Sequence, residues 1–133
     1  PKVYIRDTGI LNSLLELETE AEILRHPKCG ASWEGFVIEQ LIRVLEIDHP
    51  YYWATHQGAE IDLVFNKSGR MYGVEVKRAD APAMTPSMRI ALEDLKLERI
   101  AVVYPGNKRY SLDKKIEVVP FNDITGGIEK IFG

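Results

Sequence analysis

Apolar and polar positions alternate with two different periods along the chain, and the changes of period divide it into helices and strands. The segment His26–Glu46 repeats apolar residues every three to four positions. Its apolar stripe is broader than a surface helix needs, so we expect this helix to lie flat on a sheet. Upstream, Lys2–Arg6 predicts a short strand, and residues 10–17 predict a helix for which Asp7 or Thr8 is a suitable N-cap.

Three short segments suited to strands follow the long helix. They are Tyr51–Thr55, Glu60–Phe65 and Met71–Lys77. The connections HQG and NKSG carry turn-forming residues, so the three segments are expected to form an antiparallel meander.

A further helix and strand come next. Thr85 is a suitable N-cap, Pro86 a suitable first helical residue, and apolar residues then recur on one helical face. The segment Ile100–Tyr104 predicts a strand parallel to the third strand of the meander, because a strand, a helix and a strand at this spacing form a crossover unit. One more strand is expected near Ile116–Val119, followed by a short helix interrupted by glycine. The pattern therefore predicts an α/β fold: a mixed sheet with helices on both faces.

Composition narrows the class of protein. A chain of 133 residues with 45% hydrophobic residues is the size of one domain, residues 1–133. The single cysteine, Cys29, excludes an internal disulfide framework and fits a reducing, cytoplasmic setting. No apolar run reaches the roughly 20 residues of a membrane helix, so no membrane partner is expected. The net charge of −3 argues mildly against a nonspecific nucleic-acid binder, although residues 70–115 carry an excess of basic side chains.

Charged residues interrupt two strands that are otherwise built to be buried. Strict alternation places Asp62 on the face opposite to Ile61, Leu63 and Phe65. In the next strand it places Glu75 and Lys77 on one face, opposite to the flanking apolar residues. If the two strands pair, Asp62 and Glu75 come within reach of each other beside Lys77. Two close carboxylates repel unless a positive charge lies between them, and oxygen ligands of this kind suit Mg²⁺ or Mn²⁺.

A third acid, Glu34, lies along the apolar stripe of the long helix and so faces the predicted sheet. Each of these acids also has an ordinary interpretation. The strand acids suit a half-exposed strand with a solvated face, and Glu34 suits the positive end of a helix dipole. It is their combination that favours a metal site.

These residues carry a resemblance to a known superfamily. An acid on the first core helix, then Asp62, then Glu75-Val76-Lys77 resembles the PD-(D/E)XK nucleases, with Ile61 in place of the proline of the motif. Over essentially the whole chain, segments such as WEGFVIEQL, EIDLVF and VEVKRA resemble a domain of unknown function that follows AAA+ ATPase modules in prokaryotic proteins. The resemblance implies a restriction-endonuclease-like core. It also implies an ATPase upstream of Pro1, which would account for a first residue that is not methionine.

The roles of the superfamily's residues carry over to the matching positions. The resemblance implies that Asp62, Glu75 and the backbone carbonyl of Val76 hold Mg²⁺ or Mn²⁺. Lys77 would orient the attacking water and balance charge on the phosphate, and Glu34 would complete the shell, directly or through water. The implied reaction is metal-assisted hydrolysis of a phosphodiester in DNA, with RNA left open.

Basic residues of the middle of the chain are candidates for contact with nucleic acid, although such residues also suit an ordinary solvated face. The candidates are Arg78, Arg89, Lys108 and Arg109. The alternative to a nuclease is a catalytically inactive module that binds nucleic acid or protein for an attached ATPase, or that holds a homo-oligomer together.

Overall fold

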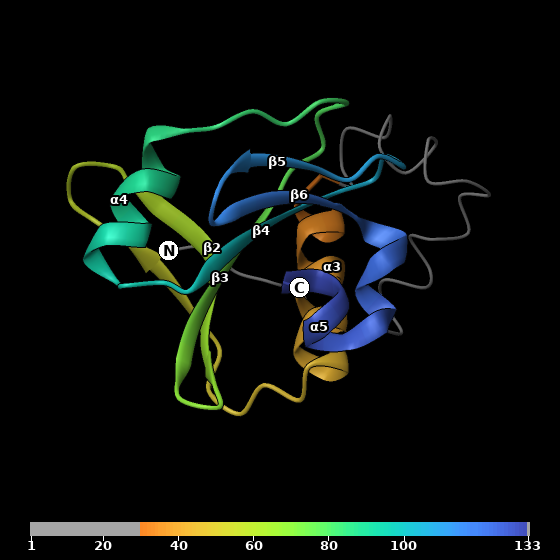
Figure 1. Cartoon of the computed structure of the whole chain (residues 1–133), viewed down its shortest axis with the longest axis horizontal. Helices are drawn as coiled ribbons and strands as arrows, with labels where there is room; N and C mark the ends of the chain where they lie inside the picture. Colours follow the sequence, from red (N-terminus) through yellow and green to blue (C-terminus); the bar gives the residue numbers. More distant parts are fainter. Residues whose placement is uncertain (1–29, 133) are drawn as a thin grey trace.

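A computed structural model describes residues 30–132, and all structural statements refer to them (Figure 1). The strands form one six-stranded sheet in the order β1-β2-β3-β4-β6-β5. The strands are β1 (Tyr51–Ala54), β2 (Glu60–Lys67), β3 (Arg70–Val76), β4 (Arg99–Tyr104), β5 (Tyr110–Asp113) and β6 (Ile116–Pro120). The helices are α3 (Gly30–Val44), α4 (Pro86–Asp94), the 3-10 helix η1 (Phe121–Gly126) and α5 (Gly127–Phe132).

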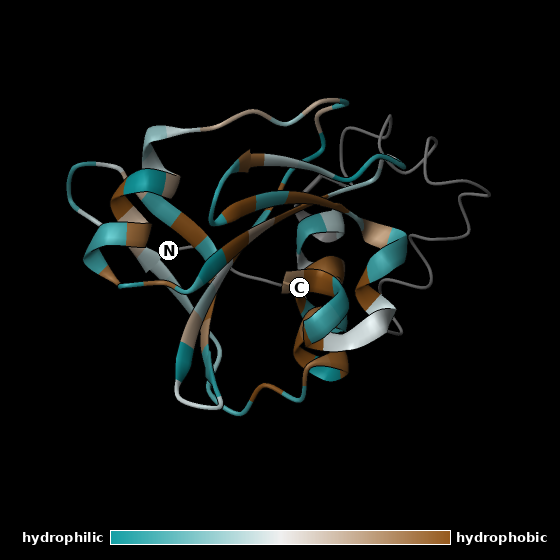
Figure 2. Ribbon diagram, in the orientation of Figure 1, coloured by the Kyte–Doolittle hydropathy of each residue, from teal (hydrophilic) through white to brown (hydrophobic). Residues whose placement is uncertain are grey.

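Helix α3 covers one face of the sheet together with η1 and α5, and α4 covers the other face (Figure 1). Along α3, Trp33, Val37 and Leu41 are buried against strand residues such as Val74 and Val103. Figure 2 shows apolar residues along α3 and along the central strands. The broad stripe predicted from the sequence is confirmed as the surface that packs on the sheet.

Helix α4 builds a second, smaller core on the opposite face. Met88 and Ala91 are fully buried there, and Leu92 and Leu95 pack against the same cluster, as the helical spacing predicts. Thr85 occupies the N-cap position in an extended conformation, but its side chain makes no capping hydrogen bond. The expected mixed sheet with a helix on each face is therefore confirmed.

The strand order follows the predicted topology. Strands β1, β2 and β3 form the antiparallel meander, and β3 pairs with β4 in parallel through the crossover helix α4. Strand β6 pairs in parallel with β4. Strand β5 was not expected from the sequence, and it pairs antiparallel with β6 at one edge of the sheet.

The start of β2 departs from the expected alternation. Tyr51 pairs with Val64 but Trp53 pairs with Ile61, so β2 accommodates one extra residue opposite β1. Such a bulge resets the alternation of side chains. Ile61 consequently packs with Val64 on the α4 face, whereas Leu63 lies on the α3 face. The prediction that Ile61 and Leu63 share a face is therefore wrong, and the bulge that separates them lies at Asp62.

Two predicted elements, the strand Lys2–Arg6 and the helix at residues 10–17, lie outside the described residues. The predicted final helix corresponds to η1 and α5, which meet at Gly127 with a φ of 79°. None of the described helices is long and apolar enough to cross a membrane.

Candidate active site

The ends of several strands and the starts of two helices meet at one end of the sheet, which we call the carboxyl edge. The parallel strands β3, β4 and β6 end there, and β2 begins there. The first turns of α3 reach the same edge, because Trp33 packs on Phe121 directly after β6, with ring centroids 5.0 Å apart. The start of α4 is also close, since Ser87 Oγ accepts the Glu60 N–H at 3.3 Å.

At this edge Asp62 and Glu75 link β2 to β3 through their side chains. The last strand pair formed at this end joins Leu63 to Val74. Beyond it, Glu75 Oε1 accepts the backbone N–H of Asp62 at 2.9 Å, and Asp62 Oδ2 accepts the backbone N–H of Val76 at 2.9 Å. The two carboxylates thus replace the regular ladder with reciprocal hydrogen bonds. The prediction that these two acids meet is confirmed by this geometry.

Both acids are removed from solvent. Asp62 is 3% exposed and Glu75 is 5% exposed, and they are the two buried charged residues of the described chain. The pKa of Glu75 is raised from 4.5 to about 7, first by burial and then by the charge of Asp62, while Lys77 acts to lower it. The negative charge of the pair is therefore costly within the fold, and a nearby cation would relieve that cost.

Lys77 supplies one such cation from the end of β3. Its Nζ lies 3.2 Å from Glu75 Oε2, and its side chain is 38% exposed whereas that of Glu75 is 6% exposed. The backbone N–H of Lys77 donates to Val103 O at 2.9 Å, which continues the pairing of β3 with β4 and fixes the residue. The Lys77 side chain therefore contacts a buried carboxylate through its amine while remaining partly exposed to solvent at the carboxyl edge.

The donor set at this edge suits a hard divalent cation. Two adjacent carboxylates are the ligands with which Mg²⁺ or Mn²⁺ is held in proteins, with water completing the coordination. Asp62 and Glu75 would hold the ion, and the carbonyl of Val76 belongs to the same strand end. Among residues 30–132, no group of three or more His, Cys, Asp and Glu side chains is arranged to hold a metal. The candidate site is thus a pair of side-chain ligands.

Glu34 lies in the part of α3 that approaches the carboxyl edge. It is half-buried and adjacent to Trp33, which packs on Phe121. The helix acid is therefore at the expected end of the sheet, on the α3 side. It does not join Asp62 and Glu75 in a three-membered ligand group. A direct third ligand is not formed, and a contribution through water stays a prediction.

Three polar residues beside the pair were not singled out by sequence reasoning. Tyr52 Oη donates a hydrogen bond to the carboxylate of Glu60, and the backbone N–H of Glu60 donates to Ser87 Oγ. These bonds tie β1, the start of β2 and the start of α4 together at the carboxyl edge. Glu60 lies two residues before Asp62 in the same strand, but its partners come from segments 8 and 27 residues away and cannot be read from local spacing.

The predicted nucleic-acid contacts divide into two kinds. Arg78 and Lys108 are exposed and follow the ends of β3 and β4. Arg89 pairs with Asp113 at 3.5 Å. Arg109 donates to Glu117 Oε2 at 2.9 Å, and also to carbonyl oxygens in the last turn of α5. The guanidinium groups of these two residues are therefore engaged within the domain.

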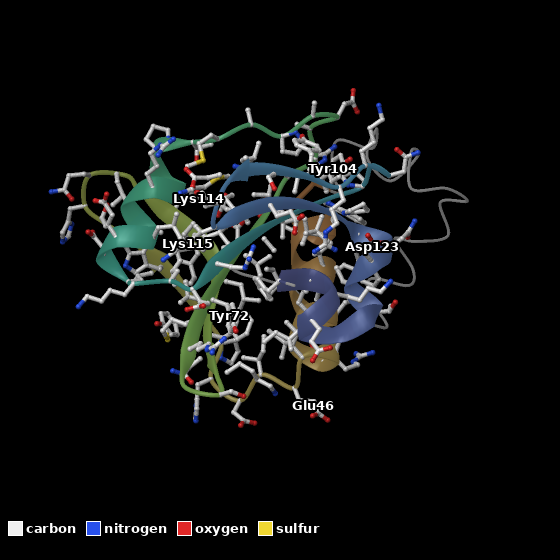
Figure 3. All side chains as sticks on the ribbon, viewed as in Figure 1. Glu46, Tyr72, Tyr104, Lys114, Lys115 and Asp123 are labelled. Carbon is white, nitrogen blue, oxygen red and sulfur yellow. The ribbon has the colours of Figure 1, made fainter. Side chains whose placement is uncertain are left out.

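Other basic residues from the middle of the chain lie far from the pair. Figure 3 shows Lys114 and Lys115 on the side of α4, away from Tyr104 at the end of β4. Lys115 O accepts the N–H of Ile100 at the start of β4, which is the opposite end of the sheet. The basic segment of the sequence therefore does not fold into one continuous strip at the carboxyl edge.

Comparison with known proteins identifies longer relatives. Two curated proteins, Uncharacterized protein Mb2031c of Mycobacterium bovis and Uncharacterized protein Rv2008c of Mycobacterium tuberculosis, are each 49% identical over 133 residues. The match covers 98% of this chain but only 30% of each relative. No solved structure matches the chain significantly. Residues 29–124 match the family model described as Domain of unknown function (DUF4143), and the chain belongs to that family.

Proposed function

We propose that this domain is a divalent-cation-dependent phosphodiesterase that hydrolyses DNA at the carboxyl edge of its sheet. The observation that carries the proposal is the reciprocal pair formed by Asp62 and Glu75, with Lys77 Nζ 3.2 Å from Glu75. Two buried acids and a lysine at the ends of adjacent strands match the residue types of the PD-(D/E)XK superfamily. The restriction-endonuclease-like classification of the core is part of the same proposal.

The residues of this chain supply distinct parts of the chemistry. Asp62 and Glu75 would hold Mg²⁺ or Mn²⁺, which lowers the pKa of a bound water and stabilises charge on phosphorus. Lys77 is partly exposed and fixed through its backbone, so its amine can orient a water molecule or contact a phosphate oxygen. Because both carboxylates are buried, bulk water has little access to them.

The proposal extends to the longer protein. The chain spans 30% of the length of its curated relatives, which leaves room for further modules. Together with the resemblance described above, this supports an ATPase module upstream of the nuclease-like domain.

Cleavage assays test the proposal directly. The purified chain is incubated with supercoiled plasmid or single-stranded DNA in Mn²⁺, Mg²⁺ or a chelator. Nicking that requires the cation is expected, and Asp62→Asn, Glu75→Gln and Lys77→Met should each lower its rate by about a hundredfold or more. Glu34→Gln should lower the rate less if this acid acts through water.

Matched controls separate chemistry from contamination. Glu98→Gln and Lys115→Met change the same residue types at the opposite end of the sheet and should retain full activity. Equal cleavage by every variant would assign the activity to a contaminant and contradict the proposal.

One observation favours a second function, a catalytically inactive module that binds nucleic acid or protein. The carboxylates already accept backbone N–H groups, and Lys77 already contacts Glu75, so their charge is partly balanced without a metal ion. Thermal melting in Mn²⁺ distinguishes the two functions. A ligand at a hundred times its Kd stabilises a fold by about 2.7 kcal/mol. The nuclease proposal requires such stabilisation in the native chain and its loss in Asp62→Asn, whereas identical melts with and without Mn²⁺ favour the inactive module.

A further inference from the structure

Tyr104 lies at the end of β4, beside Lys77 at the end of the neighbouring strand (Figure 3). Glu75 of β3 pairs with Val102 of β4, and paired residues of adjacent strands project to the same face of a sheet. Val102 and Tyr104 both belong to the core on the α4 face. The Lys77 amine contacts the Glu75 carboxylate at 3.2 Å, which places it on that face as well. Tyr104 and Lys77 are therefore neighbours on the α4 side of the carboxyl edge.

The hydroxyl of Tyr104 fixes the loop that joins β4 to β5. The side chain is 2% exposed, and its Oη donates to Lys108 O at 2.6 Å and accepts the Lys108 N–H at 2.8 Å. One buried side chain thus holds both backbone polar groups of one loop residue. Gly106 permits this close approach, because a Cβ there would overlap the ring of Tyr104. The backbone of Lys108 is therefore fixed, although the residue is exposed.

A second tyrosine makes a similar bond to an uncharged residue. The ring of Tyr110 lies edge-on to that of Tyr104, with centroids 6.4 Å apart, and Tyr110 Oη donates to Pro82 O at 2.7 Å. Pro82 belongs to the connection between β3 and α4. The two hydroxyls thus perform the same structural task, but only that of Tyr104 holds a residue with a positive side chain.

A lysine with a fixed backbone is well suited to bind an anion. It loses less conformational freedom on binding than a lysine on a loose loop, so more of the ionic attraction is available as affinity. Lys77 and Lys108 are brought to the same side of the carboxyl edge by adjacent strand ends. Negative charges repeat along a nucleic-acid strand, so two lysines in this arrangement suit two phosphates of one strand.

We propose that Tyr104 is a positioning residue for the substrate: it holds Lys108 so that the lysine amine binds a backbone phosphate next to the one at Lys77. The inference rests on the proposed nuclease function, in which the phosphate at Lys77 is the one that is cleaved. The substrate strand then crosses the end of β4 on the α4 side. Contact with phosphates alone makes this binding independent of base sequence.

DNA affinity in the absence of cleavage tests the role of Lys108 on the 133-residue chain. Fluorescence anisotropy of labelled single-stranded and duplex oligonucleotides is measured in a chelator at several NaCl concentrations. Lys108→Met should weaken binding by about threefold to tenfold, and should reduce the slope of log affinity against log salt by about 0.7 to 0.9. Lys115→Met, which removes the same charge at the opposite end of the sheet, should change neither quantity.

A double-variant cycle tests the positioning by Tyr104. Tyr104→Phe keeps the ring but removes both bonds to Lys108, so DNA affinity should fall by about twofold to fivefold. In a chain that already carries Lys108→Met, the same change should have no further effect, because no amine remains to be positioned. Tyr110→Phe is the matched control: it should lower the Tm as Tyr104→Phe does, yet leave DNA affinity unchanged.

Cleavage kinetics in Mn²⁺ separate binding from chemistry. Lys108→Met and Tyr104→Phe should raise KM and leave kcat nearly unchanged, whereas Lys77→Met should lower kcat. Lys108→Arg keeps the charge and should keep KM within about twofold of the native value.

Three results would overturn the inference. They are absence of DNA binding by the native chain, equal weakening by Lys108→Met and Lys115→Met, and an equal effect of Tyr104→Phe with and without the Lys108 amine. The last two leave the nuclease proposal intact, since that proposal depends on cation-dependent cleavage and its loss in Asp62→Asn. Binding that requires Lys108 and Tyr104 without any cleavage would support the contact and contradict the nuclease proposal instead.

Discussion

Strand β2 pairs with β3 in two different ways at its two ends. From Leu63 to Lys67 it forms a regular ladder with β3 that closes in a tight turn, where Ser68 and Gly69 have φ values of 56° and 79°. At Asp62 the ladder stops, a bulge shifts the register with β1, and carboxylates take over the link to β3. One strand therefore contains a regular, apolar end and an irregular, charged end.

The two ends contribute differently to the stability of the domain. The regular end buries Phe65 and Tyr72 in the larger core, where their rings stack 5.6 Å apart. The irregular end buries Asp62 beside Glu75 of β3, whose pKa is raised to about 7, and this costs free energy. The proposed active site lies where the regular pairing of β2 with β3 stops. The regular part of β2 holds that site in place.

The largest expected effect tests the bulge itself. Ile61 and Leu63 are both buried but lie in different cores. Ile61→Ala and Leu63→Ala should each lower the free energy of unfolding by about 2 to 5 kcal/mol. Because the two side chains share no core, the double variant should be additive within about 0.5 kcal/mol in urea unfolding. A coupling energy well above that value would indicate that the two side chains share one core, and would contradict the bulge.

The next effect concerns the charged end and is a dependence on pH. The pKa of Glu75 is raised from 4.5 to about 7, so the folded protein holds this proton more tightly than the unfolded chain. Stability from this group is therefore greatest below about pH 4.5, falls as the pH rises from there to about 7, and stays lower above that, by at most about 3 kcal/mol.

Glu75→Gln isolates this contribution, since the amide oxygen can still accept the Asp62 N–H. The unfolding free energy of the native chain minus that of the variant, measured in urea from pH 4.5 to 8, should decline across this window. A flat difference would show that burial of Glu75 carries no such cost. Mn²⁺ at pH 8 should reduce the decline if the carboxylates bind it.

A smaller effect is expected at the regular end. Gly69 takes a φ of 79° in the turn, and its N–H donates to Asn66 Oδ1 at 3.3 Å. Gly69→Ala has room for the added carbon but strains the backbone, so it should destabilise the domain by about 1 kcal/mol. Thermal unfolding measures the change, and it should leave any Mn²⁺-dependent activity intact. A loss of activity at constant stability would mean that the two ends of β2 are coupled.

The smallest effect should be a gain. Ser68 has a φ of 56°, which asparagine tolerates better, and Asn-Gly is the preferred pair for a two-residue hairpin turn. Ser68→Asn should therefore stabilise the domain by about 0.5 kcal/mol in the same melts. Unchanged or lower stability would show that the serine side chain contributes to the turn.

The regular end of β2 could be predicted from sequence, and the irregular end only in part. The NKSG connection and the flanking alternation sufficed to predict the hairpin, although the strands extend to Lys67 and Arg70 and leave a two-residue turn. The meeting of Asp62 with Glu75 also followed from pairing. The segment EIDLVF, however, reads as a regular strand, and the bulge depends on its pairing with Tyr51 and Trp53.

Other features also depend on tertiary contacts. Strand β5 has only four residues, two of them polar, and it forms because β6 provides a partner. Thr85 is placed at the N-cap as predicted, yet its hydroxyl makes no capping bond. The position of Lys115, away from the carboxyl edge, could not follow from a count of charges along the chain.

The contacts of Arg109 join the last strand pair to the end of the described chain. Its guanidinium bridges Glu117 on β6 and the carbonyl oxygens of Lys130 and Ile131. Opening of α5 therefore removes an anchor from the start of β5. We expect the amides of these two segments to exchange with deuterium as one cooperative unit, ahead of the central strands, so that the domain unfolds from its β5 side.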